Sequence, residues 1–191
     1  GERYEIDGKL YFFDRSGYML TGIINYFEPS TKETVYYNCG TDGVASLLTG
    51  PMNGYFYIDG VKQRNYKLVQ SSEGNFYFID AGHRILVNKT IYLGNTYISG
   101  HTYADGTPLL EGNYTFDAEG KMVIKNGPIG DYFYKNNKIQ KRYQLVEYEG
   151  DFYFIDAGDR LLKNTRVYLN ADFVSGFTYS DGEALKPGYY E

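Results

Sequence analysis

The chain has 191 residues and a formal net charge of −5 at pH 7. An acidic chain lacks the basic surface that grips phosphate backbones, so we expect no nucleic-acid partner. No apolar run approaches the ~18 residues that a membrane helix requires, so we expect no membrane span. The single cysteine, Cys39, excludes an intramolecular disulfide and is expected to be a small apolar filler beside a turn.

Blocks of aromatic residues followed by a polar turn recur along the whole chain. Tyrosine occurs 23 times, phenylalanine 12 times and glycine 23 times, and this composition favours strands and tight turns. Most turns contain Asp-Gly or a related pair, which tolerates the positive φ angles of a β-hairpin. In chain order the blocks are GKLYFFDRSGYMLTG (8–22), VYYNCGTDGVASLLTG (35–50), GYFYIDGVKQ (54–63), GNFYFIDAGHRIL (74–86), GNYTFDAEGKMV (112–123), DYFYKNNKIQ (131–140) and GDFYFIDAGDRLL (150–162).

A longer repeat of about 77 residues overlies these short blocks. Residues 55–114 pair with residues 132–190 after one deletion near Ser72, which indicates that several hairpins were duplicated together. The predicted parts of the chain are irregular N-terminal hairpins in residues 1–50, a first copy of the long repeat in residues 51–128, and a truncated second copy in residues 129–191.

The fold class expected from these patterns is all-β. Glycines interrupt almost every window in which a helical apolar pattern could develop, so helix signals are poor. A single hairpin is marginal in water, whereas stacked hairpins share buried surface. The sequence therefore predicts a solenoid-like array of stacked β-hairpins that includes the duplicated block.

The block at residues 7–22 resembles the cell-wall-binding repeat of Gram-positive surface proteins. That group includes choline-binding modules and the glucan-binding repeats of streptococcal glucosyltransferases and clostridial toxins. The resemblance implies a superhelix of hairpins that attaches a secreted or surface protein to the cell wall without catalysis. The residues that match the family pattern are Gly8, Tyr11, Phe12, Phe13, Asp14, Gly17, Met19, Thr21 and Gly22.

In the choline-binding members, two tryptophans and a tyrosine form a box between hairpins that holds the quaternary ammonium. Here Leu10 and Ile23 stand at tryptophan positions of the pattern, and the chain has no tryptophan. Cation–π attraction is strongest with tryptophan, so choline is not expected as a ligand. The expected partner is a cell-wall polysaccharide or glucan.

Exposed aromatic rings are the candidate ligand-binding groups, because a flat ring can stack on the apolar face of a sugar. The alternative is that the same rings form the core of the hairpins. Tyr92 and Tyr168 lie outside the aromatic blocks and are the stronger candidates for a site. The full set of stacking candidates is Tyr11, Phe76, Tyr77, Tyr92, Phe152, Tyr153 and Tyr168.

Catalytic and metal-binding patterns are weak. A paired-carboxylate glycosidase is the enzyme alternative, but nearly every Asp occupies a turn position with a structural role. The two histidines are not shared between the long repeats, since Asp159 stands opposite His83 and Phe177 stands opposite His101. Nucleophile-elbow, phosphate-loop and EF-hand spacings are absent from the sequence. We expect no catalytic residue, no metal and no cofactor.

The sequence thus favours a non-catalytic cell-wall or carbohydrate-binding module of a secreted or surface-attached bacterial protein. Two alternatives remain at this point. One is an adhesin or toxin-like segment that binds a host glycan or protein, and the other is a purely structural stalk.

Overall fold

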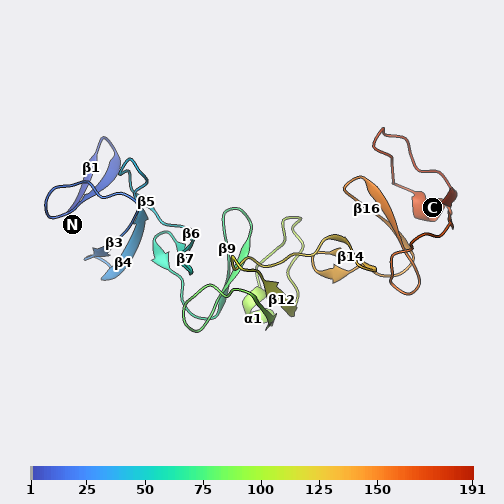
Figure 1. Ribbon diagram of the computed structural model, residues 1–191, viewed down its shortest axis with the longest axis horizontal. Helices are drawn as coiled ribbons and strands as arrows, with labels where there is room; N and C mark the ends of the chain where they lie inside the picture. The colour runs from blue at the N-terminus through green and yellow to red at the C-terminus, as the bar shows by residue number, and fades with distance from the viewer. Residues whose placement is uncertain (1) are drawn as a thin grey trace. The chain divides into compact units, whose positions relative to one another are not determined.

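A computed structural model describes residues 2–191 and divides into two compact units, with unit 1 ending at Val123 and unit 2 starting at Ile124. Strands account for 44% of the chain and helices for 4%, which confirms the all-β class. Among residues 2–191 every strand pair is antiparallel, and each sheet has only two or three strands. Figure 1 shows the strands as short ribbons separated by loops. The division of the repeats into residues 1–50, 51–128 and 129–191 concerns the sequence pattern and stays a prediction.

The elements of unit 1 form five consecutive sheets and one short helix. They are β1 (Glu2–Ile6), β2 (Lys9–Phe13), β3 (Ile23–Glu28), β4 (Glu33–Asn38), β5 (Ser46–Leu47), β6 (Gly50–Met52), β7 (Tyr55–Ile58), β8 (Val61–Lys62), β9 (Lys67–Gln70), β10 (Phe76–Ile79), β11 (Lys89–Leu93), α1 (Asn95–Ile98) and β12 (Gly112–Phe116). The pairs β1–β2, β9–β10 and β11–β12 form two-stranded sheets, whereas β3–β4–β5 and β6–β7–β8 have three strands.

Unit 2 repeats this pattern on a smaller scale. Its elements are β13 (Gly127–Ile129), β14 (Tyr132–Lys135), β15 (Lys138–Ile139), β16 (Gln144–Tyr148), β17 (Asp151–Ile155), β18 (Val167–Leu169), α2 (Ala171–Val174) and β19 (Gly188–Tyr190). The sheets are β13–β14–β15, β16–β17 and β18–β19.

The turns form where the sequence places Asp, Asn and Gly. Asp59 and Gly60 join β7 to β8 with φ angles of 49° and 77°, and Asn136 and Asn137 join β14 to β15 with 51° and 65°. Consecutive positive φ angles are typical of the tight hairpin turn that matches strand twist. The predicted hairpin turns are therefore confirmed at both positions.

The longer turns are closed by an aspartate side chain at their start. Asp80 Oδ1 accepts hydrogen bonds from the backbone N–H groups of Gly82 at 2.8 Å and Arg84 at 3.0 Å. The same two bonds recur from the carboxylates of Asp14, Asp117 and Asp156. These carboxylates satisfy turn N–H groups that no ladder partner reaches.

Both faces of β10 are buried, as its unbroken run of apolar residues requires. Phe76 and Phe78 pack into one cluster with Tyr114 and Phe116, whereas Tyr77 and Ile79 pack into another with Phe56.

Elsewhere in unit 1, Cys39 is fully buried beside Phe12 and Tyr37, and desolvation raises the pKa of its thiol. The expected role of Cys39 as an apolar filler is thus confirmed.

Neighbouring hairpins are joined by one or two backbone hydrogen bonds outside the ladders. In unit 1, Ile85 N–H donates to Gly54 O at 2.9 Å, and Met122 N–H donates to Phe76 O at 2.8 Å. Few bonds therefore cross from one hairpin to the next, and apolar packing provides the remaining contact.

The helices α1 and α2 were not predicted from the sequence. Each has four residues and lies between the two strands of a hairpin, α1 between β11 and β12 and α2 between β18 and β19. Their single buried side chains, Ile98 and Val174, contribute to the clusters beneath. One helical turn is too short to leave a periodic apolar pattern.

Candidate functional site

Four aromatic side chains of unit 1 line a hollow of about 470 Å³, here called the aromatic groove. Phe78 comes from β10, Tyr92 from β11 and Tyr97 from α1, while Tyr66 directly precedes β9. The remaining lining residues are Asp80, Ala81, Gly82, Leu86, Lys89 and Ile91. The groove therefore combines flat rings with one acidic and one basic side chain.

The rings of the groove differ in exposure. Phe78 is buried and forms the floor, with its ring centroid 6.2 Å from that of Tyr66 and 5.6 Å from that of Tyr97. Tyr66 is 57% exposed and Tyr92 is 61% exposed, so both rings keep a face open to solvent. Exposed rings that gather in one hollow are candidates for ligand contact.

Tyr92 is held in place by Glu111. The Tyr92 hydroxyl donates a hydrogen bond to Glu111 Oε2 at 3.2 Å, and Glu111 Oε1 accepts the backbone N–H of Asn95 at 2.8 Å. The nearby Glu111 charge, with smaller contributions from desolvation and this hydrogen bond, raises the pKa of Tyr92. Tyr92 therefore stays a neutral, oriented ring at physiological pH.

The polar groups of the groove suit the hydroxyls of a sugar. Both turn bonds to Asp80 use its Oδ1 atom, which leaves the second carboxylate oxygen for another donor. Lys89 is exposed at the start of β11 and supplies an ammonium donor. Stacking faces flanked by a few polar groups are what a sugar ring requires.

Unit 2 carries a related arrangement of rings. Tyr143 and Phe154 lie 6.1 Å apart between ring centroids, and Phe154 and Phe173 lie 5.3 Å apart. These three residues occupy the positions of Tyr66, Phe78 and Tyr97 in the long repeat. Tyr168, at the position of Tyr92, is likewise exposed.

The predicted stacking candidates fall into three groups. Tyr92 lines the aromatic groove and Tyr168 is exposed on β18, so the binding role predicted for both rings stays a prediction. Phe76 and Tyr77 are only 1% and 2% exposed, so neither ring offers a face to a ligand in this structure. The half-buried candidates are Tyr11, Phe152 and Tyr153.

The burial of Phe76 and Tyr77 has a simple physical reason. Phe76 packs edge-on against the rings of His101 and Tyr103, and Tyr77 packs against Phe56. Both therefore belong to the core, which is the alternative role of the seven aromatic candidates. Phe152 similarly contacts the ring of Phe177.

Sequence reasoning missed Tyr66 and Tyr97 as groove residues. The long repeat contained one available signal, because Tyr66 recurs as Tyr143 outside any aromatic block, like Tyr92 and Tyr168. Tyr97 gave no comparable signal, since it lies on the unpredicted helix α1.

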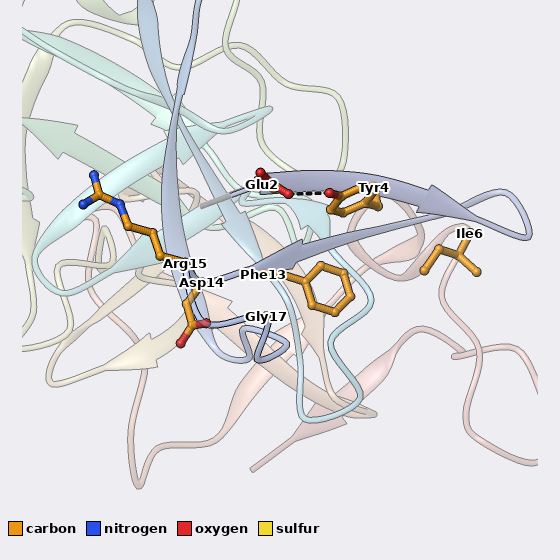
Figure 2. A pocket seen from close by; sticks show the side chains of 7 residues that line it. All are labelled: Glu2, Tyr4, Ile6, Phe13, Asp14, Arg15 and Gly17. Atoms are coloured by element: carbon orange, nitrogen blue, oxygen red, sulfur yellow. Dashed lines mark hydrogen bonds between the residues drawn. The ribbon is translucent and has the colours of Figure 1, made fainter.

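A larger hollow of about 610 Å³ lies on the β1–β2 hairpin (Figure 2). Tyr4, Ile6 and Phe13 gather on one side of it, while Arg15 extends away from them. The Tyr4 hydroxyl donates to Glu2, which raises the pKa of Tyr4, and the Tyr4 ring meets the edge of Phe13. The Tyr4 and Phe13 rings already pack against each other edge-on, so this hollow is a weaker candidate for stacking on a ligand.

Some tyrosine faces are already occupied by cations of the chain itself. Lys62 Nζ lies 3.8 Å from the ring centroid of Tyr55 and 5.6 Å from that of Tyr36. The Arg84 guanidinium lies 5.1 Å from the Tyr55 centroid. These two rings therefore already carry cation–π contacts, which a free ammonium ligand would have to replace.

The histidines have structural surroundings. His83 Nδ1 accepts the backbone N–H of Asn65, and Asp159 Oδ1 accepts the equivalent N–H of Arg142.

Over residues 2–191, no group of three His, Cys, Asp or Glu side chains is placed to hold a metal ion. Neither described helix is long and apolar enough to cross a membrane.

No protein-family model and no curated protein sequence matches the chain. Among solved structures, the modular autolysin LytC from Streptococcus pneumoniae, in complex with a synthetic peptidoglycan ligand, aligns with 95% of this chain and 42% of its own, at 14% identity and a TM-score of 0.35. Choline-binding protein F from the same organism aligns with 96% of this chain and 86% of its own, at 15% identity and a TM-score of 0.30. Truncated alternansucrase from Leuconostoc mesenteroides aligns with 87% of this chain and 11% of its own, at 20% identity and a TM-score of 0.30.

These proteins come from the group of choline-binding and glucan-binding repeat proteins that the sequence blocks resemble. The chain spans less than half the length of the autolysin and a small part of alternansucrase. The expectation that choline is not a ligand is not borne out. That expectation stays a prediction.

Proposed function

We propose that the chain is a non-catalytic module that binds cell-wall polysaccharide or glucan through the aromatic groove. The observation that carries this proposal is the pair of exposed rings, Tyr66 and Tyr92, which line one hollow together with the buried Phe78. Stacking on a sugar face would cover these rings, and Asp80 and Lys89 would bind its hydroxyls.

The orientation of Tyr92 supports binding without large rearrangement. Glu111 anchors the hydroxyl, so the ring loses little conformational freedom when a sugar stacks on it. A single groove would still bind weakly, because it is open and its rings are few. Several grooves along a polymer would raise the avidity.

The carboxylates near the groove support a non-catalytic role. Asp80 Oδ1 is occupied by two turn N–H groups, and both oxygens of Glu111 accept hydrogen bonds. A glycosidase needs one acid that can give up a proton to the leaving group and a second carboxylate across the sugar. Acids that hold turns and rings together are poorly suited to either task.

The finer features of the proposal concern arrangement and location. Hydrogen bonds such as Ile85 N–H to Gly54 O in unit 1 and Leu161 N–H to Asp131 O in unit 2 support hairpins stacked as a solenoid within each unit, with a duplicated block. A repeat of this kind fits a protein that is secreted or held at a bacterial cell surface, as the sequence resemblance implies.

The test is a pull-down on insoluble α-glucan and on peptidoglycan, together with titration of isomaltotriose, the ligand found in one alternansucrase structure. We expect the double variant Tyr66→Ala, Tyr92→Ala to bind about tenfold more weakly, because two stacking faces are lost. Tyr18→Ala is the matched control, since Tyr18 is also an exposed tyrosine but lies outside the groove.

Choline is the second arm of this experiment. Because Lys62 and Arg84 already occupy the faces of Tyr36 and Tyr55, millimolar choline should not release the chain from either polymer. Equal loss of binding in the Tyr18→Ala control would contradict the groove, and elution by choline would contradict the exclusion of choline. Release of sugar from the polymer would show that the chain is an enzyme.

A further inference from the structure

We propose a second, chemically different site in unit 2: a platform formed by Arg166, Tyr168 and Tyr189 that binds a carboxylate-bearing sugar. Nothing in this proposal depends on the aromatic groove of unit 1, and it selects for charge as well as for a ring face. The three residues are called the acidic-sugar platform below.

The two strands of the β18–β19 hairpin place these side chains on one face. Tyr168 and Tyr189 are directly paired across the strands, and their ring centroids lie 5.1 Å apart with an interplanar angle of 66°. Arg166 stands two residues before Tyr168 and therefore projects to the same side of the ribbon. Its guanidinium carbon lies 4.7 Å from the Tyr189 ring centroid.

The platform is open to solvent despite its apolar area. Tyr168 is 54% exposed and Tyr189 is 65% exposed, and Arg166 is exposed as well. Within residues 2–191, Arg166 forms no ion pair with a carboxylate. A guanidinium that rests on a ring keeps the N–H groups at its edge available for a planar anion.

The equivalent hairpin of unit 1 lacks this arrangement. There Thr90 replaces Arg166 and bonds the Thr115 hydroxyl across the strands at 2.8 Å, and Asn113 replaces Tyr189. The two threonine hydroxyls of β11–β12 therefore satisfy each other, whereas β18–β19 presents a cation with donors to spare. The two hairpins hold the same place in the order of elements and differ in the residues that face outward.

A carboxylate near the platform sets its limits. Glu191 directly follows β19, one residue beyond the Val167–Tyr190 pair, so it lies at the same end of the hairpin as Arg166. Together with the net charge of −5, this acid disfavours a ligand that places several negative charges at the platform at once. A sugar ring that places one carboxylate there needs only the single guanidinium, and its apolar face can stack on the exposed Tyr168 ring, so uronic-acid sugars are the ligand class.

The probe is trigalacturonic acid, and its methyl ester is the matched ligand that keeps the rings and removes the charge. We expect the full chain to bind the acid about tenfold more tightly than the ester, in a salt-sensitive manner, because the charged hydrogen bonds are lost with the ester. Inorganic phosphate, which offers an anion without a sugar face, should compete only weakly.

Variants separate the charge from the rings. Arg166→Gln should weaken acid binding about tenfold and leave ester binding unchanged, whereas Tyr168→Ala with Tyr189→Ala should weaken both. Glu191→Gln should strengthen acid binding. Arg84→Gln is the matched control, because Arg84 is an exposed arginine that also lies over a tyrosine ring and carries the same charge.

The outcomes that overturn the proposal are distinct from those that overturn the groove. Equal affinity for acid and ester, unchanged acid binding in Arg166→Gln, or an equal loss in Arg84→Gln would each rule out the platform. Circular dichroism and melting curves confirm that each variant is folded. The groove variant Tyr66→Ala, Tyr92→Ala should keep full affinity for trigalacturonate, whatever its effect on glucan.

Discussion

Residues 55–116 and residues 132–190 form the same succession of hairpins and a one-turn helix, but they stabilise the start of that helix differently. In the first stretch the N-cap is Gly94, which has no side chain, and Glu111 reaches from the start of β12 to bind the Asn95 N–H. In the second, the Asn170 side chain itself accepts the N–H groups of Asp172 and Phe173 at 2.9 and 3.3 Å.

The exchange of caps has a consequence for the neighbouring tyrosine. Because Glu111 caps α1 from a distance, it can also bind the Tyr92 hydroxyl and fix that ring in the groove. Where Asn170 caps α2 locally, the position of Glu111 is Pro187, and Tyr168 packs against Tyr189 instead. A local change in helix capping thus goes together with a different use of the exposed ring.

The largest expected difference between the stretches concerns their cores. Phe76 is fully buried, so Phe76→Ala should lower the free energy of unfolding by about 3–5 kcal/mol. Phe152, its counterpart, is only half-buried, and Phe152→Ala should cost clearly less. Denaturant unfolding followed by tyrosine fluorescence and by amide exchange in each unit measures both. Equal costs would contradict the difference in burial.

The caps should have an intermediate effect. Asn170→Ala removes the side chain that accepts two helix N–H groups and should destabilise unit 2 by about 1 kcal/mol. Glu111→Ala should likewise expose the Asn95 amide to faster hydrogen exchange and release Tyr92. Amide exchange at α1 and α2 is the measurement.

Gly94→Asn provides the control for the cap comparison. The backbone of Gly94 is extended, with φ −80° and ψ 171°, and an added Cβ would meet only Tyr92 at an ordinary contact distance of 3.8 Å. In the Glu111→Ala background, Gly94→Asn should therefore restore protection of α1 without restoring the position of Tyr92. Failure to restore protection would show that the two caps are not interchangeable.

The smallest expected effect is a pH dependence specific to the first stretch. Burial lowers the pKa of His101, and a hydrogen bond with the Leu68 backbone offsets this only in part. The folded chain therefore favours the neutral imidazole. Its contribution to stability is fully present above the unfolded pKa of about 6.5 and is lost as the pH falls through the lower folded pKa.

The substitution His101→Phe tests this dependence, because the second stretch has Phe177 at the same place. Near neutral pH the difference between the two melting temperatures should not change with pH. Below pH about 6.5 the melting temperature of the wild type should fall faster than that of the variant. His83 is present in both proteins and does not affect the comparison. Parallel curves over the acidic range would assign the pH dependence to other groups.

Much of the fold could be predicted from the sequence because its turns are chemically explicit. Asp59-Gly60 and Asn136-Asn137 adopt the positive φ angles that their residue types favour, so these hairpins were located correctly. The helices α1 and α2 could not be predicted, since one turn of helix depends on tertiary contacts and caps such as Glu111 rather than on a local pattern.

The site could be predicted only in part. Tyr92 and Tyr168 were proposed because they lie outside the aromatic blocks, whereas Tyr66 and Tyr97 meet Phe78 only after three separate elements fold together. Phe76 and Tyr77 looked equally available, because an aromatic strand in sequence does not tell which of its faces is covered. In β10 both faces are covered, by two different clusters.

The hairpin tips have a consequence for protein engineering. The deletion near Ser72 falls at such a tip: β9 and β10 are joined through Ser71–Asn75, where Gly74 N–H bonds Ser71 O, whereas β16 and β17 are joined by Glu149 and Gly150 alone. Both connections keep the strands antiparallel and in the same register, since Phe78 pairs with Leu68 and Phe154 pairs with Leu145. The turn therefore absorbs the additional residue of the first stretch without changing which side chains lie opposite each other. A peptide tag or fluorophore attachment sequence inserted between Ser72 and Glu73 should therefore leave both units folded and both proposed sites intact.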